Sequence, residues 1–311
     1  MRRPTDRTEP TMTEPDQIPR NFLGLSHRAA DYAAARVVVL PIGFEATTTY
    51  GTGTRGGPEA ILAASRQVET FDPDLDVDLA DAPIHTADDV APDLSSPGAM
   101  TDRIQRVAGR FLADGKWVLG LGGEHSVTLG LVRAAADRHG PLSILQIDAH
   151  LDLRAEFEGT PYSHASVMRR CVEDGHRTVH VGIRNACREE VEFARRKSLP
   201  IFWARQCAAH HGESAAGDDW IEKAVAALRS PVYVSVDVDG LDPSIIRTTG
   251  TPEPGGLGWW PTLALIDSIF QHHTVVGADV VELVAGGDPA SDFAAARLAA
   301  KLAALAIHAR R

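Results

Sequence analysis

From about residue 36 onwards, apolar residues occur in short continuous runs. Continuous runs, unlike alternating apolar and polar positions, are typical of strands that are covered on both faces. We therefore expect buried strands at Val37–Ile42, Trp117–Leu121, Leu142–Ile147, Thr178–Ile183, Pro200–Trp203, Val232–Val236 and Val275–Val281.

Helical stretches separate these runs. Pro58 and Pro97 each predict a helix start, because proline suits the first helical position. Further helices are predicted at Ser126–Arg138, Arg188–Lys197, Asp219–Leu228, Pro261–Phe270 and Ser291–Ala309. Strands and helices that alternate at this spacing predict an α/β fold with a mostly parallel sheet and helices on both sides. The acidic, proline-rich residues 71–97 are expected to form a long surface connection, and residues 207–218 a second loop.

Length and composition fit one enzyme-sized domain. The chain has 311 residues, of which 44% are hydrophobic; we expect a disordered tail over residues 1–20 and a single catalytic domain over residues 21–311. The net charge of −11 argues against a nucleic-acid partner and is compatible with a cationic substrate. Three cysteines without CxxC spacing, Cys171, Cys187 and Cys207, predict reduced thiols in a cytoplasmic protein. Because residues 2–20 lack an apolar core, no secretory signal is expected, and no apolar run reaches the ~18 residues that a membrane span needs.

Two short acidic motifs follow predicted strands. Asp148, His150 and Asp152 alternate along the chain, as do Asp237 and Asp239, so in extended backbone each set points to one side. Gathering four carboxylates in a poorly solvated place is costly unless a cation neutralises them. With His125 of the Gly-Gly-Glu-His motif at 122–125, the set has two histidines and four aspartates, which suits two adjacent divalent metal ions.

These motifs share one position in the predicted fold. His125, Asp148, Asp237 and Glu282 all lie at or just past the carboxyl ends of predicted strands, where open α/β sheets build their sites. A single aspartate after a strand is usually a turn or helix-cap residue, but three such clusters at strand ends favour a functional site. Because no Lys-Ser/Thr follows Gly122-Gly123, a nucleotide-binding loop is not expected.

Three ordered motifs resemble the signatures of the ureohydrolase family, which contains arginase, agmatinase, guanidinobutyrase and formiminoglutamase. They are Gly-Gly-Glu-His-Ser at 122–126, Asp-Ala-His-Leu-Asp at 148–152, and Ser-Val-Asp-Val-Asp-Gly-Leu-Asp-Pro-Ser at 235–244. Residues 53–58 and 249–256 are also similar to the family pattern, and the likeness extends from about Val37 to Ile307. The resemblance implies a three-layer α/β/α sandwich around a parallel sheet.

The resemblance also implies a ligand set. His125 and Asp152 would hold one metal ion, His150 and Asp239 the other, and Asp148 and Asp237 would bridge both. The family's usual metal is manganese. Oxygen-rich ligands with some imidazole and no thiolate agree with Mn²⁺, while leaving Co²⁺, Ni²⁺ and Fe²⁺ open.

The implied chemistry is hydrolysis of a guanidino group by a hydroxide formed at the ion pair. By resemblance, Asp152 relays a proton to the departing amine, His164 shuttles protons, and the Glu282 carboxylate holds the guanidinium. The chain departs from the family at Leu283–Asp288, where the family has Asn-Pro soon after the glutamate; the substrate contact there is expected to differ.

Residues 153–164 and 251–254 are most similar to the agmatinase branch, which implies cleavage of agmatine to putrescine and urea. Glu156, Glu158 and Glu253 are candidates to bind the distal ammonium, whereas Arg154 would favour a carboxylate. Guanidinobutyrate, guanidinopropionate, arginine and guanidine remain alternative substrates. Two other classes are a non-catalytic metal-binding relative and a one-zinc deacetylase of similar architecture. The resemblance further implies a homo-oligomer, a trimer or hexamer.

Overall fold

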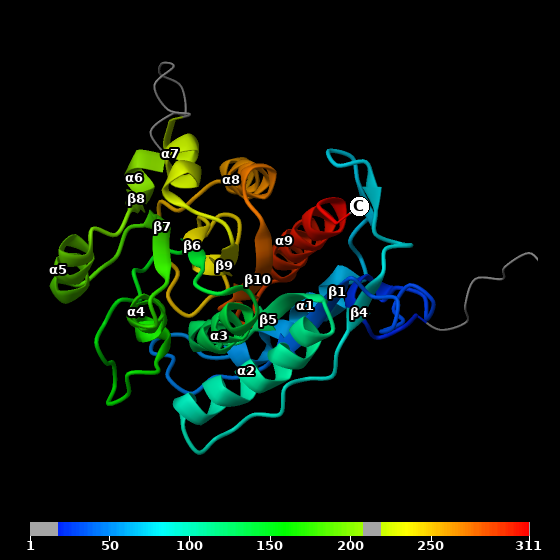
Figure 1. Cartoon of the computed structure of the whole chain (residues 1–311), viewed down its shortest axis with the longest axis horizontal. Coiled ribbons are helices and arrows are strands. Elements are labelled where there is room, and N and C mark those ends of the chain that lie inside the picture. The colour runs from blue at the N-terminus through cyan, green and yellow to red at the C-terminus, as the bar shows by residue number, and fades with distance from the viewer. Residues whose placement is uncertain (1–17, 208–218, 311) are drawn as a thin grey trace, which may run out of the picture.

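The computed structural model describes residues 18–207 and 219–310. Its centre is an eight-stranded sheet in the order β4-β1-β5-β10-β9-β6-β7-β8, in which every neighbouring pair is parallel (Figure 1). The strands are β1 (Val37–Ile42), β4 (Ile84–Thr86), β5 (Trp117–Gly122), β6 (Ser143–Ile147), β7 (Arg177–Ile183), β8 (Ile201–Trp203), β9 (Val232–Asp237) and β10 (Val275–Val281). Two short strands, β2 (Phe71–Asp72) and β3 (Val77–Asp78), form a separate antiparallel pair.

Helices cover both faces of the sheet. They are α1 (Gly57–Ser65), α2 (Pro97–Ala113), α3 (Thr128–His139), α4 (Val167–Glu173), α5 (Arg188–Lys197), α6 (Ala204–Cys207), α7 (Asp219–Ala227), α8 (Trp259–His272) and α9 (Pro289–His308). Buried residues of α1, α7, α8 and α9 pack on one face, and those of α2, α3, α4 and α5 pack on the other. The three-layer α/β/α sandwich predicted from the sequence is therefore confirmed.

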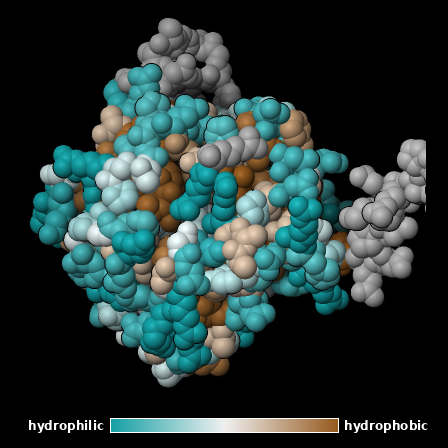
Figure 2. All heavy atoms as spheres, turned by 45° about the vertical axis from the view of Figure 1, so that its right-hand side comes forward, coloured by the Kyte–Doolittle hydropathy of each residue, from teal (hydrophilic) through white to brown (hydrophobic). Residues whose placement is uncertain are grey.

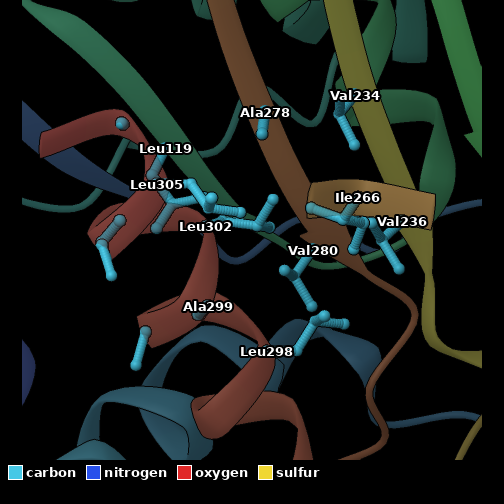
Figure 3. Packing of buried hydrophobic residues seen from close by; sticks show 14 of the residues in the cluster. Leu119, Val234, Val236, Ile266, Ala278, Val280, Leu298, Ala299, Leu302 and Leu305 are labelled. Carbon is cyan, nitrogen blue, oxygen red and sulfur yellow. The ribbon is translucent and has the colours of Figure 1, made fainter. Parts of the chain in front are cut away.

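Neighbouring residues of one strand enter opposite cores. In β1, Val37 and Val39 belong to one hydrophobic cluster, while Val38 and Leu40 belong to the other. This follows from the two-residue repeat of a strand, and it explains why the strands are apolar throughout. Figure 3 shows one of these cores, in which leucines of α9 meet side chains of β5, β9 and β10.

The seven strands predicted from the sequence are confirmed with ends within one residue, and the predicted helices with ends within two. The prediction for residues 71–97 was wrong in part, because β4 adds an edge strand to the sheet and β2 pairs with β3. Strands of two or three residues are too short to give a pattern amid acidic residues and prolines. Residues 208–218 of the predicted second loop and residues 1–17 of the predicted tail lie outside the described residues.

Polar side chains dominate the face drawn in Figure 2, where apolar residues are scattered in small areas. Among the helices that the structure describes, none is both long and apolar enough to cross a membrane. Cys171, Cys187 and Cys207 are all free thiols, as the sequence predicted.

Candidate metal centre

Four adjacent strands at the middle of the sheet position the candidate site. β5, β10, β9 and β6 are neighbours in that order, and each ends at or just before a predicted site residue. His125 begins a 3₁₀ turn after β5, Glu282 follows β10, Asp237 ends β9, and Asp148 follows β6. Parallel pairing therefore brings residues more than 150 positions apart to one edge of the sheet.

Imidazole Nδ1 of His125 is surrounded by three carboxylates. It lies 2.8 Å from an Asp152 oxygen, 3.1 Å from Asp148 and 3.4 Å from Asp237. His125 and Asp148 are fully buried, and Asp152 and Asp237 nearly so. One group of candidate ligands thus consists of His125, Asp148 and Asp152, with Asp237 beside it.

A second group shares Asp148 with the first. Nδ1 of His150 lies 3.0 Å from an Asp239 oxygen and 3.6 Å from an Asp148 oxygen. In each group the candidate ligand atoms all lie within 4.8 Å of one another. Because Asp148 offers one oxygen to each group, the structure holds two adjacent ligand sets around a common carboxylate, and all six predicted ligands are brought together.

Close backbone packing lets the third motif reach the second. A Cβ atom on Gly240 would lie 2.7 Å from the Asp148 nitrogen, so only glycine permits this approach. The carboxylate of Asp239 then accepts a hydrogen bond from the Ala149 N–H at 3.0 Å. The Asp-Gly pair, which alone would suit a turn, here joins two ligand-bearing loops.

The crowded acids shift one another's pKa values. Burial, together with the charge of Asp148, raises the pKa of Asp152 to about 7. Burial and the charge of Asp239 raise the pKa of Asp237 well above its ordinary value. For His150, hydrogen bonds to Asp148 and Asp239 outweigh burial and raise the pKa to about 12. The site therefore attracts positive charge, whether as protons or as metal ions.

The residues present fit a pair of divalent ions. Nδ1 of His125 is buried and has no well-directed hydrogen bond, although three carboxylate oxygens lie within 3.4 Å. A nitrogen lone pair in this position suits a metal ion better than a proton shared among several acceptors. Four carboxylates also balance the charge of two divalent cations.

Side chains behind the ligands fix their orientation, and sequence reasoning did not identify them. Nε2 of His125 lies 3.0 Å from the Ser235 hydroxyl, which donates to Asp279 at 2.7 Å. Gln146 donates from its amide to Asp148 at 2.6 Å and contacts buried His180 through its amide oxygen. Ser235 and Gln146 each precede a ligand aspartate by two residues, so strand alternation offered the signal that would have found them.

A cavity of about 230 Å³ opens above the ligands. Its lining includes His150, Asp152, Asp237 and Asp239 from the ligand set, together with His164 and Glu282. The Glu282 backbone has a left-handed φ of 67°, and its carboxylate accepts the His125 N–H at 2.6 Å. Burial raises the Glu282 pKa well above its ordinary value and lowers that of His164. All three predicted catalytic residues, Asp152, His164 and Glu282, therefore face one cavity.

The outer part of the cavity carries different chemistry. Arg154 lies over the Phe157 ring at 4.9 Å, and both line the cavity. Asn185, in the loop after β7, donates to the Glu253 carboxylate at 2.5 Å. Of the three glutamates predicted as ammonium ligands, Glu253 lies beside the cavity lining.

The other two predicted ammonium ligands, Glu156 and Glu158, are solvent-exposed and do not line the cavity. The unusual segment after Glu282 packs back on its neighbours: Leu283 is fully buried and the Val284 N–H donates to Thr248 at 2.9 Å. The start of this segment is therefore packed next to Glu282, whereas Gly286 and Gly287 are exposed.

A parallel α/β/α sandwich with paired carboxylate–imidazole sets at its strand ends is an α/β fold with a candidate site for two metal ions. Residues 35–308 match the sequence profile of the Arginase family, so the chain belongs to that family and is a hydrolytic enzyme.

Curated relatives cover nearly the whole chain. An N(1)-aminopropylagmatine ureohydrolase of Synechocystis sp. is 41% identical over 293 residues, covering 91% of this chain and 93% of the relative. An agmatinase of Pyrococcus horikoshii is 35% identical and covers 81% and 85% respectively. Among solved structures, proclavaminate amidino hydrolase from Streptomyces clavuligerus superposes with a TM-score of 0.82 at 29% identity, covering 94% of this chain and 98% of the other.

Proposed function

We propose that this enzyme hydrolyses the guanidino group of a guanidino amine to urea and the free amine, with N(1)-aminopropylagmatine as substrate. One observation carries the proposal: the Glu282 carboxylate lines the same small cavity as His150, Asp152, Asp237 and Asp239 of the six-residue cluster. A guanidinium is a planar cation that a carboxylate binds in a fixed orientation. The substrate choice rests on the higher identity to the Synechocystis relative.

The six ligands take separate roles in this proposal. His125 and Asp152 would hold one Mn²⁺, His150 and Asp239 the second, and Asp148 and Asp237 both. Bound there, the ions supply Lewis acidity and lower the pKa of water toward neutrality.

The chain's own residues perform the remaining steps. Glu282 orients the guanidinium, so that its central carbon lies over the acid cluster. Asp152 and His164 move protons, and the C–N bond breaks as the departing nitrogen gains one. The floor of the cavity, made by the six ligand residues, is buried except for His150, which limits the access of bulk water while this occurs.

Agmatine is the second candidate substrate, favoured by the agmatinase relative and by the Asn185–Glu253 pair. This pair, together with Arg154, forms the mouth of the cavity. The two candidates share the guanidino head and the four-carbon spacer, and the aminopropyl derivative carries one further ammonium at the end of a longer tail. Arg154 in the lining opposes a tail that ends in a second cation close to the floor. The aminopropyl derivative keeps a secondary ammonium where agmatine has its terminal one, so Arg154 meets a cation in both, and the preference for the derivative rests on the higher identity to the Synechocystis relative.

Urea release from a substrate panel tests this proposal. Mn²⁺-loaded enzyme is assayed with N(1)-aminopropylagmatine, agmatine, 4-guanidinobutyrate, 3-guanidinopropionate, arginine and guanidine, with the Asp148→Ala variant as control. We expect kcat/KM to fall in the order aminopropylagmatine, agmatine, then all others. A preference for a carboxylate-bearing compound, or no urea from any of them, would overturn the assignment.

Two further properties stay predictions: a homo-oligomeric state, as a trimer or hexamer, and a cytoplasmic location. Light scattering after size-exclusion chromatography measures the first directly. A monomer at micromolar concentration would refute it.

A further inference from the structure

Glu124, the acid of the Gly-Gly-Glu-His motif, is fully buried and lies outside the six-ligand set. Its oxygen Oε2 accepts the backbone N–H groups of Ala46 and Thr47 at 2.7 and 2.6 Å. Its oxygen Oε1 accepts the hydroxyls of Ser126 at 2.5 Å and Thr47 at 3.0 Å. Four donors thus converge on one carboxylate that only accepts.

The hydroxyl of Thr47 joins this carboxylate to His164. Thr47 Oγ1 accepts the His164 backbone N–H at 3.1 Å and lies 3.1 Å from Nδ1 of the same residue. A hydroxyl has one hydrogen, and the Glu124 oxygen takes it. Thr47 Oγ1 is therefore left as an acceptor, and Nδ1 of His164 must carry the hydrogen of that contact.

The opposite hydrogen-bond direction, from the Thr47 hydroxyl to Nδ1 of His164, is unfavourable. If Thr47 donated to Nδ1, its oxygen would face the Glu124 oxygen at 3.0 Å with no hydrogen between them. Two buried acceptors would then repel each other, since neither has solvent to turn to.

We propose that Thr47 and Glu124 are positioning residues that hold His164 in the Nδ1–H form, so that Nε2 is the nitrogen that exchanges protons in the cavity. His164 lines the cavity, and no described residue hydrogen-bonds to its Nε2. The Phe157 ring, 5.6 Å away and edge-on, further limits how the imidazole can turn. This inference rests on the proposed function for the identity of the reaction, but the tautomer is a property of the protein alone.

The proton balance is simple. The imidazolium gives its Nε2 proton to the departing nitrogen as the C–N bond breaks and that bond's electron pair moves to the nitrogen. A neutral imidazole with hydrogen on Nδ1 remains, and Nε2 regains a proton from water. Thr47 need not change its hydrogen bonds during the cycle.

A matched pair of variants tests this role. Thr47→Val keeps the side-chain shape and removes the hydroxyl, whereas Thr47→Ser keeps the hydroxyl and removes the methyl. With the Mn²⁺-loaded enzyme, we expect Thr47→Val to lower kcat about 10–100-fold with KM changed less than about threefold. Thr47→Ser should stay within about threefold of the wild type, and both variants should retain the wild-type metal content. Equal kcat in the two variants would overturn the proposal.

Nitrogen–proton correlation spectra of the ring-labelled histidines, recorded on metal-depleted protein because paramagnetic Mn²⁺ broadens nearby signals, give a readout that needs no substrate. The His164 signals are identified by their loss in His164→Asn. We expect the Nδ1–H form in the wild type, mixed forms in Thr47→Val, and a shift toward Nε2–H in Glu124→Gln, whose amide can donate to Thr47.

An Nε2–H wild type, or spectra that neither variant changes, would refute the inference. If the wild type released no urea from any substrate, the proposed function would fail while these spectra would still decide the tautomer.

Discussion

The floor and the mouth of the cavity are built in different ways. At the floor, Asp148 accepts hydrogen bonds from Gln146 and from the His150 N–H, and it is fully buried. At the mouth, Asn185 is exposed and holds Glu253 through one side-chain contact. In the proposed function, the well-bonded floor carries the chemistry and the more exposed mouth selects the substrate. Changes at the floor should abolish turnover, and changes at the mouth should alter selectivity.

The largest effect is expected from the carboxylate shared by both ligand groups. Asp148→Ala removes one oxygen from each group, so neither of the two proposed ions would keep its full ligand set. We expect kcat to fall at least about 1,000-fold and metal content to fall from about two ions per chain to fewer than one. Urea assay and elemental analysis measure these, with circular dichroism to show that the fold persists. Full activity in this variant would refute the bridging role.

A smaller loss, of metal affinity, is expected when a residue that orients one of the ligands is changed. Ser235→Ala breaks the link from Asp279 to Nε2 of His125, which orients the ring. We expect Mn²⁺ affinity to fall about 10–100-fold, measured by titration of metal-depleted protein. Ser244→Ala is the matched control, because Ser244 is exposed in the same motif. Equal affinities in the two variants would show that the floor does not depend on this hydrogen bond.

Removing the metal should make stability depend on pH in a specific direction. In metal-free protein the pKa of Asp152 is raised from 3.8 to about 7, and the pKa values of Asp237 and Glu282 are also raised. The native state then holds more protons than the unfolded chain between about pH 4 and 7, so its free energy of unfolding falls as pH rises.

Mn²⁺ binds these carboxylates only when they are deprotonated, so bound Mn²⁺ should oppose the loss of stability that occurs as pH rises. We expect the Tm gain on adding Mn²⁺ to grow by at least about 5 °C between pH 5.5 and 8. Thermal unfolding of matched samples with and without Mn²⁺ measures this gain. A gain that is constant or shrinks with pH would contradict the description of the floor.

The smallest effects belong to the mouth. Asn185→Ala frees the Glu253 carboxylate, and we expect KM for the guanidino amine to rise about three- to tenfold with kcat unchanged. Arg154→Ala removes a positive charge from the lining and should lower KM for the same amine. Steady-state kinetics measure these two opposite changes in KM. A large fall in kcat from either change would mean that the mouth takes part in the chemistry.

The same contrast explains what the sequence could predict. The floor is built from short motifs at strand ends, so the parallel order of the strands brings its ligands together. The expected extended backbone was wrong for both motifs, because Asp152 has a left-handed φ of 53° and Asp239 lies in a 3₁₀ turn. The long buried strands and helices were also predictable, because each carries a clear apolar pattern.

Other features depend on contacts distant in sequence. β4 is a three-residue edge strand in an acidic segment, with no pattern of its own. The contact from Thr47 to His164 joins residues 117 positions apart, and Glu253 reaches the cavity through Asn185, 68 positions away. Neither pairing follows from local periodicity, so only the folded chain reveals them.

Titration of metal-depleted enzyme with Mn²⁺, followed by urea release from N(1)-aminopropylagmatine, tests the central claim most directly. The paired ligand groups predict that activity rises until about two ions are bound per chain and disappears again on chelation. Full activity with one ion per chain, or activity that persists in metal-depleted protein, would contradict the account.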